Sequence, residues 1–131
     1  DHLFATRLWQ NNSKVHFDIN AREDKKRIVY GGHVISLVRA LSFNGLENAQ
    51  MIIGINGGTH ANPAFANDTI YSWSEVLEKI DLNIRNIAAL RLRTVGTKDK
   101  NHGMIITSSD GKYLPTIVLD FDYWVLVPKE L

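Results

Sequence analysis

Two short segments in the first third of the chain hold the residues with the clearest chemical potential. Residues 11–18 read NNSKVHFD and place His16 between apolar neighbours, and residues 28–32 read IVYGG just before a stretch with helical periodicity. Because histidine side chains ordinarily titrate near neutral pH, His16 is a candidate general acid or base. Gly31 and Gly32 stand where the helix should begin, and free backbone N–H groups at a helix N-terminus can stabilise an oxygen that gains negative charge. The two segments together predict acid–base chemistry next to a polarised oxygen.

The glycines and the remaining histidines have simpler explanations as well. Gly31 and Gly32 permit a tight turn into the helix, and taken alone they favour that explanation; with His16 in the same frame, they favour a site. His33, in the first turn of the helix, either faces the same site or is a packed or capping side chain. His60 and a nearby amide, Asn62, are weaker candidates that could approach the active site of a partner.

Two arginines form a second group of candidates. Arg91 and Arg93 alternate with leucines, so they lie on one face of a strand. Arginine binds carboxylate or phosphate in bidentate fashion, which suits an anionic substrate or carrier. A solvated sheet face is the more common explanation. The densest basic run, residues 25–27 (KKR), is likewise either a solvated loop or a contact for the phosphates of a nucleotide carrier such as coenzyme A.

Composition excludes several classes of function. The chain has 131 residues, 44% of them hydrophobic, and a net charge of +1, which predicts one domain and no nucleic-acid or membrane partner. Zero cysteines exclude disulfides and thiol catalysis, and the five histidines lack the close spacing of zinc ligands, so no metal is predicted. No apolar run approaches the about 20 residues that span a bilayer. The N-terminus has no signal-peptide pattern, so a cytoplasmic enzyme fits best. It also has no starting Met, so we expect the numbering to begin within a larger gene product or after processing.

The hydrophobic pattern indicates the elements that must position these residues. Residues 3–9 contain good helix formers, and residues 34–41 repeat apolar side chains at helical spacing, followed by a stop at residues 44–45. The apolar surface of the second helix is wide, so we expect that helix to be mostly enclosed. No further helix separates the strand-like segments, which favours an antiparallel sheet curved around one helix, an α+β fold. The predicted strands are residues 49–56, 69–80, 88–97 and 116–127, with a turn at 108–111.

The first two segments resemble the signature of the MaoC-like and (R)-specific enoyl-CoA hydratases. That signature reads Asp-x-Asn-Pro-x-His-x-Asp and then Ile-Val-His-Gly at the head of the central helix. His16 falls on its first histidine and Tyr30 on its second, whereas Asn11 falls on the catalytic aspartate and Ser13 on the asparagine. Because a carboxamide cannot accept a proton, His16 would carry more of the proton transfer than in those enzymes.

A longer similarity extends over nearly the whole chain. It resembles the second half of the mesaconyl-CoA hydratases, also called β-methylmalyl-CoA dehydratases, which are similar to fused double hot dogs. The segments that carry the similarity are ATRL (5–8), QN (10–11), VHF (15–17), RIVYGGH (27–33), LSFNGL (41–46), NP (62–63), FA (65–66), DTIY (68–71), WSE (73–75), ALR (89–91), TKD (97–99) and VLDFDY (118–123).

The resemblance implies a hot-dog fold over residues 1–131, either a whole domain or one half of a double hot dog without its first strand. It implies a hydro-lyase that adds or removes water at the double bond of a short branched enoyl-CoA, with coenzyme A as part of the substrate and no other cofactor. A second hot-dog unit is the expected partner. Two alternatives stay open: a non-catalytic acyl-CoA-binding half, and, ranked last, a thioesterase. The implied catalytic residues are His16, Asn11, Gly31 and Gly32, and the implied substrate-binding residues are Tyr30, His33, Arg91 and Arg93.

Overall fold

The computed structural model describes residues 1–49, 51–100 and 103–129. Two helices and four strands make up the regular structure, together with two short 3₁₀ turns, η1 and η2. Every predicted helix and strand is present, and the bounds differ from the expected ones by a few residues. In chain order the elements are α1 (His2–Leu8), η1 (Lys14–His16), η2 (Ile19–Ala21), α2 (Gly31–Leu41), β1 (Met51–Thr59), β2 (Tyr71–Ile84), β3 (Ile87–Thr97) and β4 (Ile117–Pro128).

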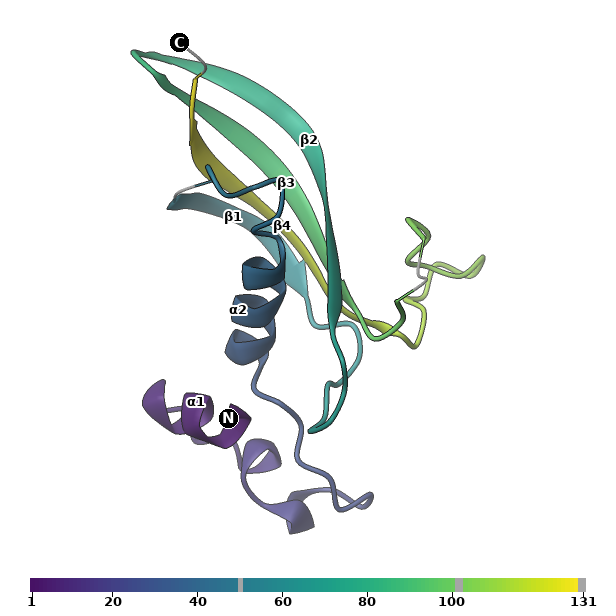
Figure 1. Ribbon diagram of the computed structural model, residues 1–131. Helices are drawn as coiled ribbons and strands as arrows, with labels where there is room; N and C mark the ends of the chain where they lie inside the picture. Colours follow the sequence, from purple (N-terminus) through teal and green to yellow (C-terminus); the bar gives the residue numbers. More distant parts are fainter. Residues whose placement is uncertain (50, 101–102, 130–131) are drawn as a thin grey trace.

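The strands form one antiparallel sheet in the order β1-β4-β3-β2, which confirms the predicted sheet type. The sheet is bowed, and α2 lies against its concave side (Figure 1). The period-two pattern of β4 turns Phe121, Tyr123 and Val125 into the core beneath the helix, where they meet Leu92 of β3. The sheet therefore supplies a continuous apolar floor for α2.

Close packing fixes the position of α2 on this floor. Val34 and Val38 are 4% and 1% exposed, and both belong to the main core cluster. A Cβ atom at Gly96 of β3 would lie 2.6 Å from Cγ2 of Val38, so only glycine lets the helix approach β3 this closely. The N-terminus of α2 is therefore held at a defined height above the sheet.

The prediction that this helix is mostly enclosed is wrong for the described part of the chain. Leu37 and Leu41 of α2 are 38% and 44% exposed, because the four strands cover one side of the helix only. Phe4, Leu8 and Trp9 in and after α1 are also exposed. The wide apolar surface seen in the sequence is real, but half of it faces outward.

A second, smaller core lies around Val95 of β3, which points away from α2. There Ile106 and Ile117 are buried with Val95, and Trp73 packs against them. The predicted turn at residues 108–111 closes this region, with the N–H of Gly111 donating to the carbonyl of Ser108 over 2.9 Å. No helix within the described residues is long and apolar enough to cross a membrane.

Candidate functional site

A cavity of about 400 Å³ lies at the N-terminal end of α2. Its walls come from the loop after α1, η1, the residues that lead into α2, the first turn of α2, the loop after β1 and the start of β4. The structure brings five of the eight predicted site residues into this one cavity: Asn11, His16, Tyr30, Gly31 and Gly32.

His16 is oriented by the backbone of the second segment. The carbonyl oxygen of Ile28 lies 2.8 Å from Nδ1 of His16, and the N–H of Ile28 donates to the carbonyl of Val15 over 3.0 Å. Because a carbonyl oxygen only accepts, Nδ1 carries a hydrogen, and in the neutral form of this tautomer the lone pair lies on Nε2. The imidazole also meets the ring of Tyr30 edge to face, with centroids 5.8 Å apart. An imidazole whose Nδ1 is held in this way presents Nε2 as the basic atom, which is the arrangement that a general base requires.

Asn11 is held in a local turn at the edge of the same cavity. Its Oδ1 accepts a hydrogen bond from the N–H of Ser13 over 2.9 Å, and its own N–H donates to the carbonyl of Thr6 over 3.1 Å. The amide can bind water or a carbonyl, but its oxygen already serves the turn.

Gly31 and Gly32 are needed for space rather than for an unusual backbone angle. Neither has a positive φ, which removes the simple turn explanation. A Cβ atom at Gly31 would lie 2.6 Å from Nε2 of His60, and one at Gly32 would lie 2.5 Å from Cζ of Tyr30. The two glycines therefore let two side chains close over the helix N-terminus, where α2 has no side-chain cap.

His60 lines the same cavity, although the sequence analysis ranked it among the weaker candidates. It follows β1 directly and lines the cavity of its own chain, although the sequence suggested the active site of a partner. Its loop is anchored by the N–H of Ala61, which donates to the carbonyl of Val118, and by the amide of Asn62, which donates to two backbone carbonyls over 2.8 and 2.9 Å. Burial lowers the pKa of the His60 imidazole. No motif marks this histidine, because its loop meets the helix only in the folded chain.

His33 lines a neighbouring cavity of about 350 Å³ together with His2 and Leu37. The two cavities share Val29, Val34 and Ala64 in their walls. Residues 25–27 line a further cavity beside Phe65, and Nζ of Lys26 lies 5.5 Å from the centre of that ring. Contacts of these residues with a substrate or carrier stay predictions.

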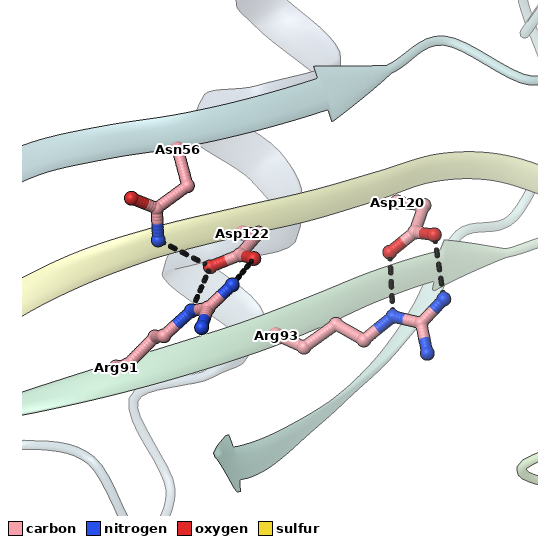
Figure 2. A network of polar contacts seen from close by, with 5 residues as sticks. All are labelled: Asn56, Arg91, Arg93, Asp120 and Asp122. Carbon is pink, nitrogen blue, oxygen red and sulfur yellow. Dashed lines mark hydrogen bonds and ion pairs between the residues drawn. The ribbon is translucent and has the colours of Figure 1, made fainter. Parts of the chain in front are cut away.

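Arg91 and Arg93 lie on the face of the sheet that points away from α2. Figure 2 shows each guanidinium held by an aspartate of β4. Arg91 donates to Asp122 over 3.0 and 2.6 Å, and Arg93 donates to Asp120 over 2.8 and 2.7 Å. Asn56 of β1 adds a hydrogen bond to Asp122. These bidentate bonds hold the pKa of both aspartates below the ordinary value and raise that of both arginines. A role for the arginines in substrate binding stays a prediction, and in this chain both are occupied by carboxylates.

Metal chemistry has no evident ligand set here. Among residues 1–49, 51–100 and 103–129, no three His, Cys, Asp or Glu side chains gather to hold a metal ion.

The chain is similar to two curated proteins over 98% of its length. It is 57% identical to mesaconyl-CoA hydratase of Cereibacter sphaeroides and 53% identical to β-methylmalyl-CoA dehydratase of Chloroflexus aurantiacus. A crystal structure of a MaoC domain dehydratase from Chloroflexus aurantiacus superposes with a TM-score of 0.93, at 52% identity and over 99% of this chain. The chain has the α+β hot-dog fold and is similar over nearly its whole length to these MaoC-like dehydratases. It spans 38% of the length of each of these three proteins. No protein-family model matches the chain.

The hot-dog fold extends to more distant structures. The (R)-hydratase of A. caviae superposes on the hot-dog domain with a TM-score of 0.56 over 95% of the chain, at 18% identity, and this likeness concerns the fold alone. The predicted α+β hot-dog fold and the family resemblance are both confirmed.

Proposed function

We propose that this hot-dog domain is a hydro-lyase unit that adds or removes water at the double bond of an enoyl thioester. The observation that carries the proposal is the orientation of His16. Its Nδ1 is fixed by the carbonyl of Ile28, so that Nε2 is the basic atom in the cavity that also contains the N-terminus of α2. A base and a site for a developing negative charge are the two features that this reaction needs.

Each side chain has a defined part in the hydration direction. Nε2 of His16 takes a proton from water as the water oxygen bonds to the β-carbon of the substrate. The electrons move toward the thioester oxygen, which the N–H groups of Gly31 and Gly32 stabilise. The proton then passes from His16 to the α-carbon, and the base is regenerated. Asn11 orients the water, and coenzyme A enters as part of the substrate, so no further cofactor takes part.

We propose a short branched enoyl-CoA such as mesaconyl-CoA as the substrate. The support is the identity to the two relatives whose names state mesaconyl-CoA and β-methylmalyl-CoA. Mesaconyl-CoA carries a free carboxylate, and none of the described residues that line the His16 cavity is an arginine or lysine. The carboxylate would therefore contact a group from outside this cavity, which favours a site completed by a second unit.

We propose another hot-dog unit as that partner. Strand β1 lies at the edge of the sheet, and its Met51, Ile52, Ile53 and Ile55 are all exposed. An edge strand with apolar side chains on both faces tends to pair with another chain or unit. The share of 38% that the chain spans of its relatives is consistent with such a pairing, either within one longer protein or between copies.

A non-catalytic, ester-binding half is the second candidate, and Asn11 is the observation that favours it. The family aspartate is absent at this position, and the amide oxygen of Asn11 is engaged by Ser13. In that case the cavity would bind the acyl-CoA while a partner unit supplies the chemistry.

The deciding experiment follows the absorbance of the conjugated enoyl thioester when the protein is mixed with mesaconyl-CoA, with crotonyl-CoA alongside. We expect the signal to decay with wild type and to decay about 10²–10⁴-fold more slowly with His16→Ala, the range that a general base contributes. His2→Ala is the matched control, because His2 is not among the described residues that line the His16 cavity, and it should keep full turnover. Tight binding without decay in wild type would establish the non-catalytic half, and release of free thiol would indicate a thioesterase.

A further inference from the structure

The side chain of His60 has a place in the His16 cavity that the proposed mechanism does not use. We infer that His60 is a second catalytic residue of this site, which donates a hydrogen bond to the thioester carbonyl beside the N-terminus of α2. The inference rests on the proposed function and deepens it, because it assigns the group that activates the carbonyl.

The contact between His60 and Gly31 carries the inference. The position of a Cβ atom on Gly31 lies 2.6 Å from Nε2, 2.9 Å from Cε1 and 3.2 Å from Cδ2 of His60. The imidazole therefore occupies the space that any other residue at position 31 would fill. Because Gly31 has no side chain, an imidazole nitrogen of His60 can lie at the N-terminus of α2. The N–H groups of this helix end are the ones proposed to hold the substrate oxygen.

The surroundings of His60 leave it suited to act on a ligand. Asn62 in the same loop gives both of its amide hydrogen bonds to the carbonyls of Leu114 and Ile117, which fixes the loop and leaves His60 next to the cavity. The described residues that line the cavity include no carboxylate, because Asn11 stands where the family has aspartate. His60 is thus, with His16 and Tyr30, one of three titratable side chains among the described residues that line this cavity.

The chemistry fits a neutral imidazole as hydrogen-bond donor. Burial lowers the pKa of His60, which favours the neutral ring at neutral pH. A neutral histidine at a helix N-terminus can polarise a carbonyl by donating its N–H, without transferring the proton. The proton balance of the hydration is therefore unchanged: water supplies the proton, His16 carries it to the α-carbon, and His60 keeps its own.

The test compares His60→Ala, which removes the donor, with His60→Gln, which keeps an N–H donor of similar reach. With mesaconyl-CoA we expect kcat to fall about 10²–10³-fold in His60→Ala, the range for loss of one such donor, while KM changes only a few-fold. His60→Gln should recover part of kcat. Far-UV circular dichroism confirms that each variant is folded.

A spectroscopic measurement on a slow background gives a readout that a structural role would not move. The enoyl thioester absorbs at longer wavelength when its carbonyl is polarised, so the ester bound to His16→Ala should be red-shifted relative to free ester. That shift should become smaller in the double variant His16→Ala/His60→Ala, in which only the N–H groups of α2 still polarise the carbonyl, and it should be restored in part with glutamine at 60.

The outcomes separate the two proposals. Wild-type turnover with unchanged kcat in His60→Ala, or a red shift that keeps its full size after loss of His60, overturns the inference. If wild type shows no turnover with either ester, the proposed function fails, and the spectrum of the ester bound to wild type and to His60→Ala still decides whether His60 contacts the carbonyl.

Discussion

Replacing Gly96 by alanine adds a methyl group where α2 lies closest to β3. The new Cβ would lie 2.6 Å from Cγ2 of Val38, 3.2 Å from Cγ2 of Val118 and 3.4 Å from Cβ of Leu119. Each of these three side chains is 1% exposed, so none can move aside into solvent. Forcing an extra methyl into a filled core costs about 1–3 kcal/mol. Alanine also restricts the unfolded chain, which returns about 0.4–1 kcal/mol.

Gly54→Ala is the matched control for this substitution. Gly54 also lies within a strand without a positive φ, and its added Cβ would meet only Cδ1 and Cβ of Trp124, at 3.8 and 4.0 Å. The entropic gain is common to both variants, so the difference in their free energies of unfolding isolates the overpacking cost, about 1–3 kcal/mol. With a urea m-value of about 1–3 kcal/mol per molar, the unfolding midpoints should differ by on the order of 1 M.

Urea titration followed by circular dichroism measures both midpoints. Because Val38 must move, α2 should shift with it, and Gly96→Ala should also lose turnover more than Gly54→Ala does. Equal midpoints for the two variants would refute the conclusion that the Gly96 contact sets the height of the helix above the sheet.

Three further predictions concern charge, chemistry and association. The pKa of Asp120 is held below its ordinary value by Arg93, so the ionised form stabilises the fold at neutral pH and this contribution is lost as the pH falls through the lowered pKa. Asp120→Asn should therefore be less stable at neutral pH, and its urea midpoint should fall less steeply below about pH 4; parallel curves would contradict this. If the domain is a hydratase, Asn11→Asp should raise turnover of mesaconyl-CoA, because it adds a carboxylate to the cavity that contains His16. A drop in kcat would show instead that the site depends on the amide of Asn11. Ile55→Lys, at a β1 side chain that is 64% exposed, should shift sedimentation toward the monomer, whereas Ile84→Lys at the hairpin end of β2 should not; an unchanged mass would exclude the β1 edge.

The elements could be predicted because their signals are local. Helical spacing in residues 34–41 and period two in β4 identify the two sides of the core directly, and the absence of a crossover helix indicates an antiparallel sheet. The two sequence segments around His16 and Gly31 were enough to identify five candidate residues that the structure places in one cavity. These features depend on neighbours in sequence or on a motif.

The exposure of one side of α2 and the position of His60 beside Gly31 could not be predicted in the same way. The width of an apolar helix surface says how much area needs cover, but not whether the cover comes from the same chain. The contact of His60 with Gly31 joins residues from different elements, and only the strand order and the anchored loop after β1 bring them together.

The arginines of β3 show how a usable signal was missed. Arg91 and Arg93 alternate on one strand, and Asp120 and Asp122 alternate on another with the same spacing of two. Two antiparallel neighbours with matching spacing and opposite charge predict cross-strand ion pairs, which need no substrate anion to satisfy the arginines. The sheet therefore uses its charged side chains to hold β3 and β4 together on the face away from α2, with Asn56 extending the network to β1. The candidate site instead takes its chemistry from loops that meet at the N-terminus of α2, where polar groups face the cavity. The charged residues that alternate on β3 and β4 therefore pair across the sheet, while the candidate residues of the proposed site lie next to the strand and helix ends, where binding and catalytic groups are commonly found.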